Sequence, residues 1–204
     1  QKSVSIPNVY AAGTTGLRLV RARSILNFVG DALITLMVLV KNANMPNAHL
    51  KLLWLSVLVI VLDQIAKYWA VTQLPFHQAV SVVPYFDWYL TYNRGAAFSF
   101  LADAGGWQRW FFTITTIIIS TVIFVWIKKL EHNEKMTAIA LSLILGGAIG
   151  NLIDRIYLGH VVDYVQIWLG NYPWPAFNIA DAAISIGAVV LILTSITDAK
   201  KSAA

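Results

Sequence analysis

The chain has 204 residues, of which 58% are hydrophobic and 12% are charged. Soluble domains carry about a quarter charged residues, so this composition excludes an ordinary soluble protein and predicts an integral membrane protein. The formal net charge of +5 lies mostly in short loops, where it reports membrane orientation and does not indicate nucleic-acid binding. The absence of cysteine excludes disulfides, thiolate nucleophiles and cysteine-ligated zinc.

Four apolar runs are long enough to cross a bilayer, which takes about 20 residues of helix. They are Leu50–Val71, Trp107–Ile127, Met136–Ile153 and Ile179–Thr197. We therefore predict an all-α membrane protein, a four-transmembrane-helix bundle with a small extracytoplasmic β-element at the membrane surface.

A fifth apolar run, Ile25–Val40, is shorter and contains Asp31. If it crossed the membrane, the arginines at positions 18, 21 and 23 would lie outside, against the positive-inside rule. We expect no fifth crossing and divide the chain into an N-terminal extension, 1–44, and a membrane-embedded domain, 45–204. Three interpretations of the extension stay open from the sequence: a basic amphipathic segment on the membrane surface, a product of the gene boundary, or a secretory signal.

Lysines fix the expected orientation. They crowd the link between the second and third runs and follow the fourth run, at Lys128, Lys129, Lys135, Lys200 and Lys201. The long segments 72–106 and 156–177 together carry one lysine or arginine, Arg94. By the positive-inside rule the link and the C-terminus are cytoplasmic, and both long segments face outward.

The outward segments have the composition of strands and loops. Val80–Leu101 is rich in β-branched and aromatic residues and predicts a small sheet on the membrane surface. Val161–Phe177 contains a glycine and two prolines and is too short to cross and return, so it predicts a short strand or an interfacial loop.

Charged and amide residues inside or at the ends of these apolar runs are candidates for function, because such groups cost several kcal/mol in a membrane. They are Asp63, Lys67, Asn151, Asp154, Arg155, Asp163, Asn178 and Asp181. With the orientation above, all of them converge on the outer leaflet. A channel or pump would be expected to place polar groups along the whole crossing.

Two of the carboxylates have a cation beside them. Asp63 and Lys67 lie at i and i+4 on one helix face, where a structural ion pair forms readily. Asp154 is followed by Arg155 at a helix end, which favours a surface ion pair or a contact with a lipid headgroup.

Asp163 and Asp181 have no lysine or arginine within one helical turn, so burial should raise their pKa values. Asp181 also fits a simpler role, because Asn178 to Asp181 resembles a helix N-cap with an acidic first turn. Two carboxylates in a poorly solvated site share one proton, which is the chemistry of aspartic proteases. Histidines without HExxH spacing disfavour a zinc protease, and no G-x-S-x-G motif is present.

Five motifs in this order carry a resemblance. They are Asp63-Gln64-Ile65-Ala66-Lys67, Asn93-Arg94-Gly95-Ala96-Ala97-Phe98, Gly147-Ala148-Ile149-Gly150-Asn151-Leu152-Ile153-Asp154-Arg155, Gly159-His160-Val161-Val162-Asp163-Tyr164 and Phe177-Asn178-Ile179-Ala180-Asp181. From about Leu50 to Thr197 the chain resembles the lipoprotein signal peptidase (signal peptidase II) family, the bacterial inner-membrane aspartic endopeptidases that process prolipoproteins.

The resemblance implies specific roles. Asp163 and Asp181 would be catalytic, and the substrate would carry an S-diacylglyceryl cysteine just after the scissile bond. The residues implied to bind the substrate or support the site are Asp63, Lys67, Asn93, Gly95, Asn151, Asp154, Arg155 and Asn178. We expect a monomer in contact with membrane lipids, with no metal or organic cofactor.

Two other functions stay open from the sequence. One is a small ion- or proton-conducting membrane protein that uses Asp63, Lys67 and Arg155 as a relay. The other is a non-catalytic factor of the same fold that binds or assembles lipoproteins.

Overall fold

The computed structural model describes residues 48–95 and 107–202, together with seven single residues between Val20 and Ile34. The extension 1–44, the absence of a crossing at Ile25–Val40 and the motif residues Ala96, Ala97 and Phe98 lie largely or wholly outside the described residues. Those expectations stay predictions.

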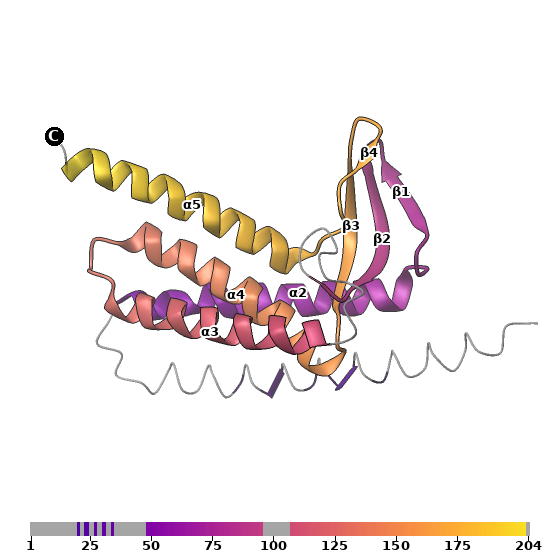
Figure 1. Ribbon diagram of the computed structural model, residues 1–204, viewed down its shortest axis with the longest axis horizontal. Helices are drawn as coiled ribbons and strands as arrows, with labels where there is room; N and C mark the ends of the chain where they lie inside the picture. Colours follow the sequence, from indigo (N-terminus) through magenta and orange to yellow (C-terminus); the bar gives the residue numbers. More distant parts are fainter. Residues whose placement is uncertain are drawn as a thin grey trace, which may run out of the picture.

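Four long helices form a bundle (Figure 1). A 3₁₀ helix, η1 (Ala48–Leu52), leads into α2 (Leu53–Gln73), and α3 (Trp107–Lys129), α4 (Lys135–Tyr157) and α5 (Ile179–Ser202) follow. Each of the four is long and apolar enough to cross a membrane. The predicted spans are therefore confirmed, with ends within a few residues of those expected from the sequence.

Helix α4 occupies the centre of the bundle and contacts α2, α3 and α5. In its most apolar stretch 61% of the residues are buried, against 17% in α3 and in α5. Glycines permit this close packing: Gly146 lies against the backbone of Ser56 in α2, and Gly147 against the backbone of Ala180 in α5. Small residues at helix contacts are typical of membrane bundles, where backbones approach closely.

The outward faces of α3 and α5 carry large exposed apolar side chains. Examples are Ile114, Ile118 and Val122 on α3, and Val189 and Leu193 on α5. In a soluble protein such faces would be unfavourable, whereas in a bilayer they contact lipid and the helices satisfy their own backbone hydrogen bonds.

A four-stranded antiparallel sheet stands at one end of the bundle, where α2 ends and α5 begins (Figure 1). Its strands are β1 (Ala79–Val83), β2 (Phe86–Asn93), β3 (Val161–Leu169) and β4 (Tyr172–Pro173), in that spatial order. The predicted β-element is confirmed, and of the two alternatives for Val161–Phe177 the strand is correct. The register of β2 and β3 pairs Thr91 with Asp163, which brings one candidate residue to the junction of sheet and bundle.

Candidate active site

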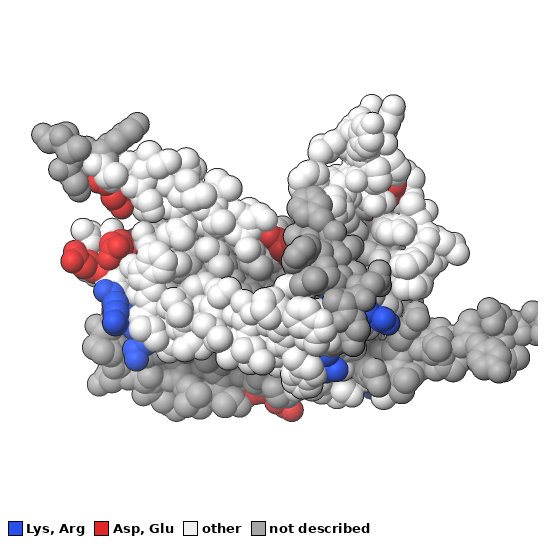
Figure 2. Space-filling model, viewed as in Figure 1, with Lys and Arg blue, Asp and Glu red and all other residues white. Residues whose placement is uncertain are grey.

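A cleft of about 760 Å³ opens between the first turns of α5 and the sheet. Figure 2 shows this notch in the surface, with acidic atoms exposed at its floor. Asp163 of β3 and Asp181 of α5 both line the cleft, together with Asn93, Asn151 and Arg155. The structure thus brings five sequence-predicted residues to one cavity from four separate parts of the chain.

Asp163 sits on β3 with only 2% of its surface exposed. Its Oδ1 accepts a hydrogen bond of 2.7 Å from Nδ2 of Asn178, and the side chain of Asn93 also bonds to it. Burial, followed by the nearby charge of Asp181, raises the pKa of Asp163 to about 7, well above the usual value for a carboxyl group. This side chain therefore keeps its proton to a higher pH than an ordinary carboxyl group does.

Asp181 lies in the first turn of α5 and is partly exposed in the cleft. Its backbone N–H donates to Oδ1 of Asn178 at 2.9 Å, and its own Oδ2 accepts from the N–H of Asn178 at 3.3 Å. This reciprocal pair caps the helix, as the simpler reading of the sequence expected. The cap leaves Oδ1 of Asp181 free to accept a bond of 2.8 Å from Nδ2 of Asn151.

Asn151 and Asn178 form the link between the two carboxylates. Asn178 Nδ2 lies 3.2 Å from Asn151 Oδ1, so the two amides bond to each other while each donates to one aspartate. Both amides are buried. Because buried polar groups stay in place only when their hydrogen bonds are satisfied, this network holds Asp163 and Asp181 at fixed positions along the cleft.

Lys67 lies behind this network. Its Nζ forms ion pairs with Asp63 at 2.8 Å and with Asp154 at 2.9 Å, and donates to Asn151 Oδ1 at 2.9 Å. The three protons of the ammonium group thus have three acceptors. The expected pair of Asp63 and Lys67 is confirmed.

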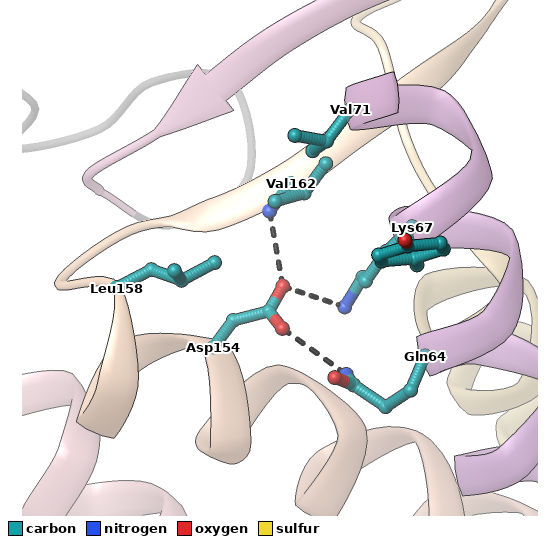
Figure 3. A pocket seen from close by; sticks show the side chains of 7 residues that line it. Gln64, Lys67, Val71, Asp154, Leu158 and Val162 are labelled. Carbon is teal, nitrogen blue, oxygen red and sulfur yellow. Dashed lines mark hydrogen bonds and ion pairs between the residues drawn. The ribbon is translucent and has the colours of Figure 1, made fainter. Parts of the chain in front are cut away.

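The expectation for Asp154 is wrong. Its surface is 1% exposed, so it makes neither a surface ion pair with Arg155 nor a headgroup contact. Figure 3 shows its carboxylate turned toward Lys67 and Gln64 of α2 and toward the backbone of Val162, whose N–H donates to it at 3.0 Å. Adjacent residues on a helix point in different directions, which is why Arg155 is not its partner.

Gln64 is a further member of this buried cluster, and its place in the first of the five motifs did not predict a role for it. Its Nε2 lies 3.2 Å from Asp63 Oδ2, 3.1 Å from Asp154 Oδ1 and 3.2 Å from the carbonyl of Gly150. An amide placed between Asp63 and Lys67 in an apolar run was the available signal, because burying an amide without partners is costly.

Arg155 does not pair directly with either cleft carboxylate among the described contacts. Its Nη2 donates to the carbonyl of Gly95 at 3.3 Å, its Nη1 donates to the carbonyl of Asn151 at 3.4 Å, and its guanidinium lies 5.5 Å from the ring of Phe112. The N–H of Gly95 in turn bonds to Oδ1 of Asn93 at 2.9 Å. Arg155 therefore places a positive charge at the cleft and anchors the chain that leaves β2.

Chemically, the cleft presents two carboxyl groups, and the pKa of one of them, Asp163, is raised to about 7. In general, two neighbouring carboxyl groups, one protonated and one ionised, can act as acid and base in the same step. Over 48–95 and 107–202, no cluster of three or more histidine, aspartate or glutamate side chains has the arrangement of a metal site.

Comparison with known proteins identifies the family. The family model described as Signal peptidase (SPase) II matches residues 55–197. The chain belongs to the signal peptidase II family. It is a multi-pass membrane protein of that family, and its four apolar helices and small sheet agree with this membership.

Individual relatives agree. A lipoprotein signal peptidase of Pseudomonas fluorescens Pf-5 is 54% identical over 156 residues, covering 73% of this chain and 92% of the relative. One from Alteromonas mediterranea is 48% identical over 144 residues, covering 71% and 79%. A solved bacterial membrane enzyme is 30% identical with a TM-score of 0.69, covering 78% of this chain and 96% of that one.

Proposed function

We propose that this chain is an aspartic endopeptidase that cleaves prolipoproteins on the N-terminal side of an S-diacylglyceryl cysteine. The observation that carries the proposal is that Asp163 and Asp181 line one cleft and are joined through two buried asparagine amides. Family membership supports the substrate class, and the raised pKa of Asp163 supports a shared proton.

In the proposed reaction the ionised aspartate removes a proton from water, and the oxygen of that water attacks the carbonyl carbon of the scissile bond. The protonated aspartate donates its proton to the carbonyl oxygen, which gives a tetrahedral intermediate. The aspartate that took the proton of water then donates it to the amide nitrogen, while the other aspartate takes a proton back from a hydroxyl of the intermediate. The C–N bond breaks, which releases the cysteine-bearing product with a free amino group and the signal peptide with a carboxyl group. Asp163 suits the protonated role because of its pKa, and Asp181 suits the base because donors from Asn151 and Asn178 surround it.

The remaining site residues would position this pair. Asn151 and Asn178 hold the aspartates, and Asp63, Lys67 and Asp154 hold Asn151 and the start of α5 from behind. Asn93, Gly95 and Arg155 line or border the cleft where the substrate would enter. No step of this mechanism requires a metal or an organic cofactor.

We further propose that the protein lies in the bacterial cytoplasmic membrane with the cleft at the outer leaflet and both ends of the peptidase domain in the cytoplasm. The lysine-rich link between α3 and α4 lies at the end of the bundle opposite the sheet (Figure 1). With the lysines inside, acyl chains of a substrate would stay in the bilayer while its peptide bond meets water at the cleft. We expect the protein to act as a monomer.

The test is a cleavage assay with the purified full chain in detergent and two substrates, a diacylglyceryl-modified prolipoprotein and the same prolipoprotein without the lipid. The proposal predicts shortening of the lipidated substrate only. Binding without shortening would favour the non-catalytic assembly factor. Proton flux into proteoliposomes with no cleavage would favour the conducting protein that uses Asp63, Lys67 and Arg155.

A further inference from the structure

The outer end of α4 is capped by an arginine from another helix. Arg109, in the first turn of α3, donates from Nε to the carbonyl of Arg155 at 2.8 Å and from Nη2 to the carbonyl of Ile156 at 2.6 Å. The last four carbonyls of a helix have no partner within it, and a cation there opposes the negative end of the helix dipole. Arg109 thus satisfies two of these four groups with one planar side chain.

The same guanidinium packs on the turn that follows α4. Gly159 has a φ of +83°, and its N–H and that of Leu158 both bond to the carbonyl of Asp154, at 3.2 and 2.7 Å. A Cβ added to Gly159 would lie 3.4 Å from Nη1 of Arg109. Arg109 therefore bonds to the last turn of α4 and lies over the space beside the left-handed residue Gly159 that follows it.

This turn joins two parts of the cleft. Arg155 precedes it on α4, and Asp163 follows it on β3, which begins at Val161, two residues after Gly159. A shift of the turn would move both residues relative to Asp181, which is held on α5. Misplacing reacting groups by about 1 Å can cost about 100-fold in rate.

We propose that Arg109 is a positioning residue that fixes the α4–β3 turn and so sets the places of Arg155 and Asp163 in the cleft. The catalytic part of this inference rests on the proposed function. The positional part does not, because it concerns the turn itself. Arg109 touches no cleft aspartate in the described contacts and acts through Arg155, Ile156 and Gly159.

Two variants of the full chain test the proposal. Arg109→Gln removes the charge and the paired hydrogen bonds to the carbonyls of Arg155 and Ile156. It should lower kcat per folded molecule by about 10- to 100-fold, while KM for the lipidated prolipoprotein stays within about threefold. Arg109→Lys keeps the charge but cannot make both hydrogen bonds with one planar group, so its kcat should lie between those of Arg109→Gln and the parent. Lys129→Gln, an exposed charge change at the other end of the same helix, is the matched control and should leave both constants unchanged.

Hydrogen exchange gives a readout that needs no catalysis. The N–H of Val162, bonded to Asp154, should exchange faster in Arg109→Gln than in the parent or in Lys129→Gln. The measurement can be made in an Asp163→Asn background, so it holds even if the aspartate pair is wrong. Unchanged exchange in 158–165, or a fall in folded yield with parental kcat per folded molecule in both Arg109 variants, would overturn the proposal.

Discussion

The carboxylate of Asp63, in the middle of α2, accepts a hydrogen bond of 2.9 Å from the backbone N–H of Ala180 in the first turn of α5. Asp63 is fully buried and holds Lys67 with its other oxygen. A negative side chain from one helix thus caps the N-terminus of another, and the same helix start carries Asp181. The ion pair of Asp63 and Lys67 is therefore connected by a hydrogen bond to the helix start that carries Asp181.

Replacing Lys67 by Met should destabilise the protein strongly. The change leaves Asp63 and Asp154 buried without their cation, and breaking a buried pair in this way costs about 3–5 kcal/mol. We expect a lower free energy of unfolding in mixed micelles and low yield, with appreciable turnover in the folded fraction. Lys51→Met, at an exposed lysine of η1, is the control.

Adding Asp63→Asn and Asp154→Asn to Lys67→Met should recover part of the lost stability, because neutral amides are cheaper to bury than unpaired carboxylates. An abundant, stable and wholly inactive Lys67→Met protein would contradict this account. It would argue that the lysine takes part in the chemistry.

Stability should depend on pH through Asp163. Its pKa is about 7 in the folded protein and near 3.8 in the unfolded chain, so the folded state binds this proton more tightly. The contribution of this bound proton to the free energy of unfolding is fully present below about pH 4 and is lost as the pH rises toward 7. Asp163→Asn has no carboxyl group to ionise. The melting temperature of this variant minus that of the parent should therefore increase as the pH rises from 5 to 8. Parallel melting curves across this range would show that the buried carboxyl does not titrate there.

Cysteine labelling should report the proposed orientation. The chain has no cysteine, so the variants Asn133→Cys, in the α3–α4 link, and Gln78→Cys, before β1, each carry a single cysteine. Labelling of each variant then reports on one position only. Both positions are exposed. An impermeant maleimide added to intact cells should label position 78 and should label position 133 only after lysis. The opposite pattern would invert the topology and move the cleft to the cytoplasmic side.

A chain that begins at Met45 should fold and cleave normally. It keeps η1, whose His49 Nε2 lies 2.6 Å from the carbonyl of Glu131 and whose Leu50 is buried in the core. A chain that begins at Leu53 loses both contacts and should be less stable in detergent. If the Met45 form fails to insert or fold, residues 1–44 are part of the domain and not an extension.

The sequence predicts the parts of this molecule that depend on neighbours along the chain. Apolar run length locates the four helices, and the i, i+4 spacing predicts the pair of Asp63 and Lys67. The expectation for Asp154 was wrong because its partners on α2, Gln64 and Lys67, are distant from it in sequence. The role of Gln64 was not predicted for the same reason. The extent of β3 was also undetermined, because it is set by pairing with β2 across two intervening helices.

For Asp163 and Asp181, the neighbouring residues in the sequence predict the raised pKa but not the shared cleft. Their lack of a neighbouring cation predicted raised pKa values, and for Asp163 a value of about 7 agrees. That the two share a cleft followed only from resemblance to a family. Spacing could not reveal it, because the amides that join them, Asn151 and Asn178, come from α4 and from the residue before α5.

The most direct test of the central claim is the turnover number of three matched variants, Asp163→Asn, Asp181→Asn and Asp154→Asn, on the lipidated prolipoprotein. Each keeps size and most hydrogen bonding. The account predicts that the first two stay folded and bind substrate but lose about 10³- to 10⁴-fold in kcat, whereas Asp154→Asn loses stability and keeps most turnover per folded molecule. The parent should show a bell-shaped pH profile that belongs to the coupled pair. A folded but inactive Asp154→Asn beside an Asp163→Asn with near-normal turnover would contradict it.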